Sequence, residues 1–470
     1  MLEVNRRNFL QLISTSALAK TKPPNIILVM ADDQGYGDLG CYGSPSIRTP
    51  HIDRMAREGI RFTDFYAQPL CGPSRAGLMT GCYPPRNSLN FNHVPRAKTG
   101  IHANEVTIAQ MLKPQGYATM AIGKWHLGDA APFLPTRHGF DHWLGLPYSN
   151  DMWPFHPKVR RDGPESAVSK ASRERAELTG FDGQGTQYPS DWFPPLPLMS
   201  DEAVLELNPD QTQLTSRYTQ AALEFIAAKR NQPFFLYLAH SMPHVPLYPG
   251  VKFAGKSARG RYGDVIEEID DGMGRILALL VKLKLDENTL VIYTSDNGPW
   301  LPYGIDAGSA GPLRQGKGTV YEGGVRVPCI MRWPGKIPAG AVTSEIACNI
   351  DLFATFAHVS GSPMPTDRKL DSLNLWPLTG RLRDTFLYFN STPRYDPTQS
   401  RPVNTTVLGA IRRGPWKLHM ESKALYRLPE DVGESNDVQL RYPEIVKELE
   451  QVAMQLAKEV TENPRPLGQL

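Results

Sequence analysis

Cysteine is scarce in this chain, and its spacing excludes two common kinds of site. The sequence holds 5 cysteines among 470 residues. No two of them form the Cys-x-x-Cys pair typical of zinc sites, and an odd number at wide spacing predicts no disulfide framework. Any special cysteine must therefore be sought singly among Cys41, Cys71, Cys82, Cys329 and Cys348.

An excess of charge and long apolar runs are missing too. The 51 basic and 48 acidic residues leave a formal net charge of +3, which gives no reason to expect a nucleic-acid partner. No segment is apolar over the roughly 20 residues that a membrane span needs, so we expect no stable membrane insertion. A chain of this length can bury a large core and carry a smaller second domain.

The N-terminus resembles a targeting signal. Arg6 and Arg7 precede Phe9, Leu10 and a short apolar stretch, an order that resembles a bacterial twin-arginine export signal. We therefore expect residues 1–22 to be an export signal, the export machinery to be a partner, and the protein to be periplasmic or secreted. A disordered tail with a chance Arg-Arg pair is the alternative.

Four short apolar runs are typical of strands buried on both faces of a parallel sheet. They cover 25–30, 117–122, 234–238 and 289–294. Helical periodicity at 214–229 and 264–280 separates the later runs. Strands that alternate with helices favour an α/β fold, with a mostly parallel sheet sandwiched by helices. Ligands bind such sheets beyond the carboxyl ends of the strands.

Polar residues follow these runs directly. Asp32 and Asp33 follow the first run, and Asp296 and Asn297 follow the fourth. Parallel strands would bring these four oxygen donors to one edge of the sheet, where they suit calcium or magnesium better than zinc or copper. A capped turn is the alternative for either pair alone. The second run leads into Gly123-Lys124-Trp125-His126, and the third into a segment with two histidines.

The stretch Cys71-Gly72-Pro73-Ser74-Arg75 combines a nucleophile, a helix start and a cation. Pro73 suits the first position of a helix, which would cover 74–80 and end at Gly81. A partly exposed Cys71 would lie just before the helix, where free N–H groups favour negative charge. Arg75 would face the same space. The arrangement suits a tetrahedral anion, and a buried thiol beside a helix cap is the alternative.

Taken in order, these stretches resemble the motifs of the type I, formylglycine-dependent sulfatases, most closely the arylsulfatase A and N-acetylgalactosamine-6-sulfatase branch. The stretch from Cys71 to Arg75 resembles the Cys-x-Pro-Ser-Arg signature, and 123–128 resembles the Gly-Lys-Trp-His segment. Two metal-binding pairs and three further loops of the site are matched by 32–35, 296–298, 148–151, 244–246 and 316–324. The similarity runs from about Asn25 to the C-terminus.

The resemblance implies a fold, a cofactor and a reaction. The fold would be alkaline-phosphatase-like, with a large mixed sheet between helices and a small C-terminal antiparallel sheet with a helix. A formylglycine-generating enzyme would oxidise Cys71, and one hydroxyl of the hydrated aldehyde would attack the sulfur of a sulfate ester. Calcium would be held by Asp32, Asp33, Cys71, Asp296 and Asn297.

The same resemblance implies roles for the basic residues of the site. Arg75, Lys124 and Lys317 would stabilise charge on the transferring group. His244, together with Lys317, would protonate the leaving oxygen. His126 would take a proton from the second hydroxyl, which releases sulfate and restores the aldehyde.

Three of the proposed contacts have ordinary alternatives. Ser149 would bind the substrate, but it could equally cap a turn. Lys317 by itself would be a solvated surface charge, and only the glycine-rich loop around it indicates that its backbone approaches a ligand. We prefer His244 to His240 as the catalytic histidine, because His244 stands in the His-x-Pro register with Pro246.

We therefore expect a sulfuric ester hydrolase acting on a sulfated sugar or an aryl sulfate. A phosphomonoesterase or phosphodiesterase of the same superfamily is one alternative. It is disfavoured by a cysteine in place of serine or threonine and by a single oxygen-rich metal site. An inactive carbohydrate-binding relative, with Cys71 unmodified, is another. The sequence leaves open which alcohol carries the sulfate, exo or endo action, and the oligomeric state.

Domain boundaries follow from composition and from the resemblance. We expect the export signal at 1–22, the catalytic domain at 23–380 and a C-terminal subdomain at 381–470. The least regular region is 157–212, rich in charge and proline. Long irregular segments of this kind are often functional, so we expect a wall of the substrate pocket there, with Trp192 as an aromatic contact. A surface insertion without a role is the alternative.

Overall fold

The computed structural model describes residues 22–154, 193–378, 383–394 and 403–470. The predicted export signal, apart from its last residue, lies outside these ranges. So do Trp192, most of the predicted pocket wall, and the boundary predicted between residues 380 and 381. The predicted catalytic, metal-binding and substrate-binding residues other than that wall all lie within the described ranges.

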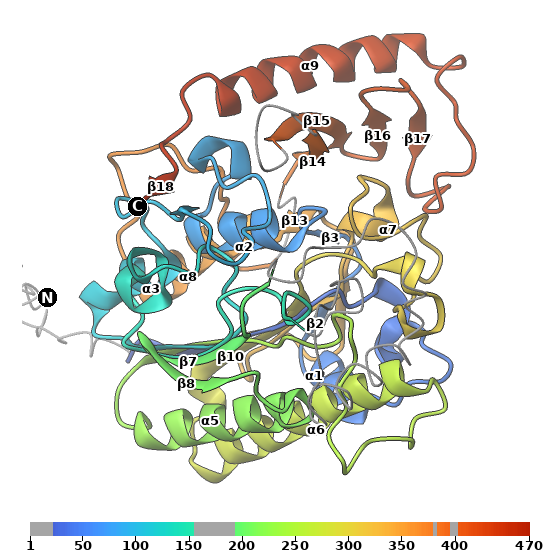
Figure 1. Cartoon of the computed structure of the whole chain (residues 1–470). Helices are drawn as coiled ribbons and strands as arrows, with labels where there is room; N and C mark the ends of the chain where they lie inside the picture. Colours follow the sequence, from blue (N-terminus) through green and yellow to red (C-terminus); the bar gives the residue numbers. More distant parts are fainter. Residues whose placement is uncertain (1–21, 155–192, 379–382, 395–402) are drawn as a thin grey trace, which may run out of the picture.

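A ten-stranded sheet forms the centre of the described chain (Figure 1). In spatial order its strands are β12 (Ala341–Thr343), β2 (Ile60–Phe62), β11 (Cys329–Arg332), β10 (Thr289–Ser295), β1 (Asn25–Ala31), β9 (Phe234–Ala239), β5 (Ala118–Gly123), β6 (His142–Gly145), β7 (Pro197–Ser200) and β8 (Ala203–Leu207). The strands from β10 to β6 run parallel, and antiparallel pairing begins on either side of them. Each predicted apolar run forms one of these central strands, which confirms the α/β prediction.

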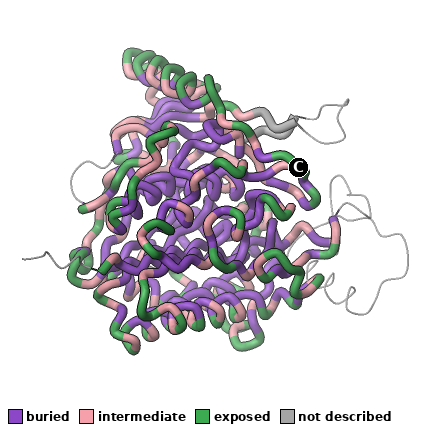
Figure 2. The backbone as a smooth tube through the Cα atoms, turned by 90° about the vertical axis from the view of Figure 1, so that its left-hand side faces the viewer, coloured by how far each residue is buried: buried purple, intermediate pink, exposed green. Residues whose placement is uncertain are grey.

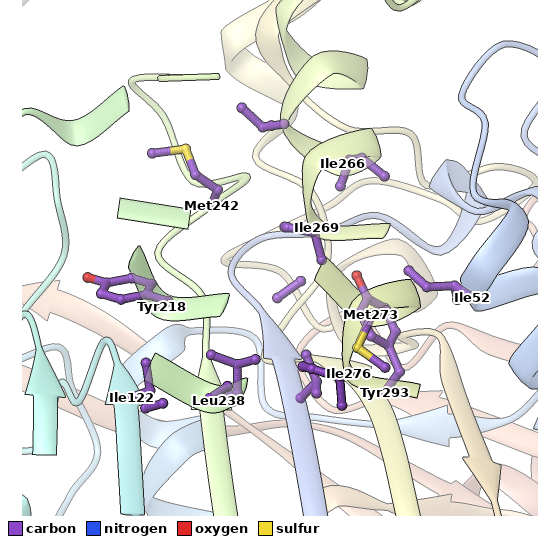
Figure 3. Packing of buried hydrophobic residues seen from close by; sticks show 14 of the residues in the cluster. Ile52, Ile122, Tyr218, Leu238, Met242, Ile266, Ile269, Met273, Ile276 and Tyr293 are labelled. Atoms are coloured by element: carbon purple, nitrogen blue, oxygen red, sulfur yellow. The ribbon is translucent and has the colours of Figure 1, made fainter. Parts of the chain in front are cut away.

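Helices cover both faces of the sheet (Figure 1). One face packs against α1 (Pro50–Arg57), α5 (Leu214–Ala228) and α6 (Arg261–Lys282), and the other against α2 (Cys71–Thr80), α3 (Ile108–Leu112) and α8 (Leu352–Ser360). Strand β1 serves both cores, because successive side chains of a strand point to opposite faces. Ile27 and Val29 join the first core, shown in Figure 3, whereas Ile26 and Leu28 join the second.

One edge of the sheet corrects a prediction. Residues 197–207, part of the region predicted to be irregular, form the β7–β8 hairpin, which pairs with β6. Leu198 points into the first core and Met199 into the second, which is the alternation of an ordinary strand. The prolines at 194, 195 and 197 concealed it, because proline inside a sheet is confined to edges and strand starts.

A second sheet follows in the chain, as expected for the C-terminal part. Its strands are β14 (Thr385–Arg394), β15 (Val403–Arg413), β16 (Trp416–His419) and β17 (Leu425–Arg427), all antiparallel, and α9 (Pro443–Thr461) lies beside it (Figure 1). Two short pairs join β13 (Ala347–Cys348) to β3 (Phe65–Tyr66) and β18 (Gly468–Gln469) to β4 (Thr99–Gly100). The core under the second sheet includes Tyr66 and Tyr83, so it is shared with the main domain.

Burial is concentrated in the middle of the molecule, and exposed residues lie mainly on the outer sides of the helices (Figure 2). All five cysteines are free. Among the helices of the described ranges, none combines the length and apolarity needed to cross a membrane.

Candidate active site

The candidate site lies at the carboxyl ends of the central strands. β1 leads into Asp32 and Asp33, β10 into Asp296 and Asn297, and β5 into Lys124. β9 leads into the segment 240–244, which contains both candidate histidines. These strands are parallel neighbours in the sheet, so their ends meet at one edge and bring the predicted residues together.

The oxygen donors after β1 and β10 are joined by hydrogen bonds. The Asp33 N–H donates to Asp296 Oδ1 at 3.1 Å, and Asn297 Nδ2 donates to Asp33 Oδ1 at 2.7 Å. Asn297 Oδ1 is buried and has no hydrogen-bond partner among the described residues. Asp33 has φ 64°, a left-handed conformation uncommon for non-glycine residues. A bound cation would explain both the unpaired oxygen of Asn297 and the left-handed backbone of Asp33.

The Cys71 thiol lies against the two carboxylates. Its Sγ is 3.4 Å from Asp32 Oδ1 and 3.7 Å from Asp33 Oδ1. Cys71 is fully buried, which corrects the partly exposed position expected from the sequence. The segment around Asn92 packs against the first turn of the helix, where Asn92 Oδ1 accepts a 2.7 Å hydrogen bond from the Gly72 N–H.

Helix α2 begins earlier than the sequence predicted. It spans Cys71–Thr80, so Cys71 is its first residue and Pro73 its third. Proline is tolerated there because N–H groups of the first turn have no partner within the helix. Gly81 ends the helix with φ 66°, in the left-handed conformation expected of a helix-terminating glycine.

The tightest group of possible metal ligands differs slightly from the predicted set. Ligand atoms of Asp32, Asp33, Cys71 and His244 all lie within 4.8 Å of one another. His244 was assigned to catalysis alone. Asp296 lies outside this tightest group but is linked to it through the N–H of Asp33.

Three basic side chains, each at most 6% exposed, pair with the three carboxylates. The pairs are Arg75 Nη2 with Asp296 Oδ2 at 2.8 Å, Lys124 Nζ with Asp32 Oδ2 at 2.6 Å, and Lys317 Nζ with Asp33 Oδ2 at 2.8 Å. Buried, oriented cations of this kind stabilise charge that develops on a bound anion.

The loop that carries Lys317 is held against the end of β10. The Lys317 N–H donates to the Pro299 carbonyl at 2.9 Å. A Cβ on Gly316 would lie 2.2 Å from that same oxygen, so only glycine fits there. The close approach predicted for this loop is therefore to the Pro299 backbone.

His244 enters the site and His240 does not. His244 Nε2 lies 3.3 Å from Ser149 Oγ and 3.5 Å from Asp33 Oδ2. Ser149 also accepts a 3.2 Å hydrogen bond from a lysine, Lys124. The His240 ring packs near Tyr218, with ring centroids 6.5 Å apart, and no side-chain hydrogen bond in the described part of the chain joins it to the site.

His126 approaches from β5 in a strained conformation. Its φ is 65°. Its Nε2 lies 3.2 Å from the carbonyl of His93, whereas its buried Nδ1 has no hydrogen-bond partner in the described ranges. A buried ring nitrogen without a partner is suited to receive a proton from a bound group.

Burial and charge together set the protonation states. Burial alone would raise the pKa of Asp32, but the charges of Lys124 and Arg75 outweigh it and lower that pKa. Burial, reinforced by the same two cations, lowers the pKa of His126 well below its ordinary value. Burial raises the pKa of the Cys71 thiol. The site therefore offers a carboxylate, a neutral imidazole and a protonated thiol, which is a poor nucleophile.

Two residues of the site follow no pattern recognised in the sequence. The ring centroids of Trp300 and His244 lie 5.5 Å apart, and Lys317 Nζ lies 4.5 Å from the centroid of the Trp300 ring. The position of Trp300 just after the Asp-Asn-Gly segment at the end of β10 was the sequence signal that could have identified it.

Both ring nitrogens of His93 are buried without a hydrogen-bond partner among the described residues. His93 follows no predicted strand, so no local pattern marked it.

Known proteins resemble this chain along most of its length. The sulfatase family profile matches residues 24–362, and the profile of the N-sulphoglucosamine sulphohydrolase C-terminal region matches 315–462. Human N-acetylgalactosamine-6-sulfatase is 41% identical over 381 residues, 78% of this chain and 68% of that protein. Human arylsulfatase A is 41% identical over 425 residues, 87% of this chain and 77% of that protein. The crystal structure of Ps i-CgsB in complex with k-i-k-neocarrahexaose matches with TM-score 0.74 and 30% identity, covering 94% of each chain.

The chain therefore belongs to the sulfatase family. It is a sulfuric ester hydrolase of the arylsulfatase A and N-acetylgalactosamine-6-sulfatase type. This confirms the family, the enzyme class and the fold that the motifs predicted.

Proposed function

We propose that this sulfatase removes sulfate from a sulfated sugar, using formylglycine made from Cys71 and a bound calcium ion. The observation that supports this best is the position of Cys71, in contact with two carboxylates that belong to a group of three carboxylates paired with three buried cations. The anionic sulfate group of an ester bound there would meet opposite charge on several sides while its sulfur faced residue 71.

The donor set fits calcium. Asp32, Asp33, Asp296 and Asn297 offer hard oxygen atoms, and Asn297 Oδ1 lacks any other partner among the described residues. These residues would hold the ion. When bound, calcium would neutralise oxygens of the sulfate group and favour the ionised form of a nearby hydroxyl.

Burial of Cys71 has a consequence for its modification. A modifying enzyme cannot reach a fully buried thiol, so conversion would occur before folding is complete. Formylglycine would supply a hydrated aldehyde, with one hydroxyl for attack on sulfur and a second whose deprotonation releases sulfate. A twin-arginine signal at 1–22 would then suit the export of a protein already modified and folded, which makes the periplasm or the exterior its proposed location.

The remaining side chains bind the anion and move protons. Arg75, Lys124 and Lys317 would hold the sulfate oxygens, which costs little reorganisation because they are already oriented. His244 Nε2, beside Ser149 Oγ, would hold the proton that the leaving oxygen takes. His126, neutral and with Nδ1 unpaired among the described residues, would accept the proton of the second hydroxyl, so the two imidazoles have opposite tasks.

The proposed substrate class follows from the relatives. One is named for action on an N-acetylgalactosamine sulfate, and the structure of a neighbour is a complex with k-i-k-neocarrahexaose. An aryl sulfate is the alternative alcohol, since the groups around the sulfate would be the same for both.

A single preparation tests the proposal. Intact-mass analysis should show the aldehyde at residue 71, and sulfate should be released from at least one 6-sulfate of N-acetylgalactosamine, N-acetylglucosamine or galactose faster than from 4-nitrophenyl sulfate. EDTA should lower both activity and the midpoint of thermal unfolding. Calcium at about 100 times its Kd adds about 2.7 kcal/mol to the free energy of unfolding, and its removal takes that stabilisation away. Calcium should restore both.

Three outcomes would contradict the proposal. Rapid turnover by protein that keeps the thiol at residue 71 would remove formylglycine from the reaction. Restoration by zinc, with calcium ineffective, would remove the oxygen-donor argument. A preference for 4-nitrophenyl sulfate over all three sugars would replace the substrate class.

A further inference from the structure

An aromatic pair lies beside the site. Trp300 and Tyr303 follow β10, with ring centroids 4.7 Å apart. Both are partly buried and pack against the first core. The neighbouring Leu301 and Ile305 are 40% and 74% exposed. The pair therefore packs against the core on one side, while part of its surface stays accessible to solvent.

Trp300 is next to the two side chains that the proposed function places at the leaving oxygen. Its ring centroid lies 4.5 Å from Lys317 Nζ and 5.5 Å from the centroid of the His244 ring. An oxygen held by both groups would share their surroundings, to which the indole belongs. An alcohol that extends from that oxygen on the side of the indole would contact Trp300.

The position of Trp300 relative to Lys317 is held by the backbone. The carbonyl of Pro299, the residue before Trp300, accepts the Lys317 N–H at 2.9 Å. One residue earlier, the Gly298 N–H donates to the Gly324 carbonyl at 3.0 Å. The indole therefore keeps a defined place beside the ammonium group before any substrate arrives, which is the preorganisation that binding specificity requires.

We infer that Trp300, supported by Tyr303, is the contact surface for the sugar ring that carries the sulfate, and that it determines specificity for the alcohol. The inference rests on the proposed function, which places the leaving oxygen beside His244 and Lys317. An indole offers a large, rigid apolar surface at low entropic cost. A pyranose ring presents C–H groups that can cover such a surface while its hydroxyls stay in water.

Trp300→Leu and Trp300→Phe test this, with Trp416→Leu as the matched control. Trp416 is also partly buried, and it packs on Tyr442 in the C-terminal subdomain at 5.0 Å between ring centroids. For each protein, KM and kcat are measured with whichever of the three sulfated sugars the wild type cleaves best. The inhibition constant of inorganic sulfate is measured alongside, because sulfate occupies the anion site and has no alcohol portion.

Trp300→Leu should raise KM for the sugar by about 10-fold and Trp300→Phe by less, while the inhibition constant of sulfate changes less than about twofold. Trp416→Leu should leave both constants unchanged. An unchanged KM in Trp300→Leu would overturn the inference. So would a parallel rise of KM and the sulfate constant, since Trp300 would then only support Lys317. Failure of the proposed function would instead appear in the wild type, as absent sulfate release from every sugar.

Discussion

Two clusters of buried charged residues in this chain have the same ionic composition, but they differ in whether every buried polar atom has a partner. The cluster at the candidate active site, called the catalytic cluster after its proposed role, combines Asp32, Asp33 and Asp296 with Arg75, Lys124 and Lys317. The interdomain cluster lies between α7 (Glu322–Val325) and the C-terminal sheet, and combines Asp64, Glu322 and Glu434 with Arg326, Arg412 and Lys417. Each holds three carboxylates and three basic side chains, so the balance of charge does not distinguish them.

The interdomain cluster satisfies its charged groups internally. Lys417 Nζ contacts Glu322 Oε1 at 2.8 Å and Glu434 Oε1 at 3.2 Å. The second oxygen of Glu434 accepts the Glu322 N–H at 2.6 Å, and the second oxygen of Glu322 accepts the Tyr66 hydroxyl at 2.7 Å. Arg326 completes the group with a 3.2 Å ion pair to Glu322. Fully paired buried charges of this kind hold a structure together and offer nothing to a ligand.

The catalytic cluster includes polar atoms without hydrogen-bond partners among the described residues. Asn297 Oδ1 and His126 Nδ1 are buried with no partner in the described part of the chain. Asp33 and His126 hold left-handed backbone conformations, with φ 64° and 65°, and so does Glu434 of the interdomain cluster, with φ 48°. Buried polar atoms without a partner, and neither the balance of charge nor the left-handed backbone, distinguish the catalytic cluster from the interdomain cluster.

The two clusters are joined by one loop. Lys317 of the catalytic cluster and Glu322 of the interdomain cluster lie on the same stretch of chain. At the start of that stretch, Arg314 Nη1 donates to the Glu434 carbonyl at 2.6 Å. The interdomain cluster therefore holds both ends of the loop that supplies Lys317 to the catalytic cluster.

Cys71→Ala should produce the largest effect and confine it to activity. Sulfate release should fall by about 1,000-fold or more, because the covalent route is lost. The free energy of unfolding should fall by only about 1 kcal/mol, since only one small side-chain group is removed from the core. Cys41→Ser is the control and should keep its activity. Substantial turnover by Cys71→Ala would exclude residue 71 as the nucleophile.

Lys417→Met should produce the complementary effect, on stability. It leaves Glu322 and Glu434 buried without their shared cation, which should lower the free energy of unfolding by about 3–5 kcal/mol in urea titrations. Lys423→Met removes a partly exposed pair with Glu450 and should cost about 0–1 kcal/mol. Equal costs for the two variants would refute the structural role of the interdomain cluster.

Acid should reveal the same cluster through a smaller effect. Burial alone would raise the pKa of Glu322, but Lys417 and Arg326 outweigh it and lower the pKa from 4.5 to about 2. A lowered pKa in the folded state adds stability that is complete above pH 4.5 and is lost as the pH falls towards 2. The fall in the thermal midpoint between pH 5 and pH 3 should therefore be smaller in Glu322→Gln than in the wild type. Identical falls would show that Glu322 does not contribute.

Much of the fold and most of the site could be predicted from short stretches of sequence. Strands β1, β5, β9 and β10 are buried on both faces, so each is a continuous apolar run that can be recognised locally. The polar residues that follow them needed no further information, because parallel strands bring their carboxyl ends to one edge. The resemblance supplied the chemistry of Cys71, which residue types and spacing could not.

Only the tertiary structure decided the features that depend on distant partners. Glu322 and Lys417 are 95 residues apart in the chain, and the burial of Cys71 depends on the segment around Asn92. Trp300 gained its place beside His244 from the packing of two loops. Local propensity and periodicity determine which segments become strands and helices. Long-range packing determines which charged groups find all their partners within the protein and which polar atoms stay available for a substrate.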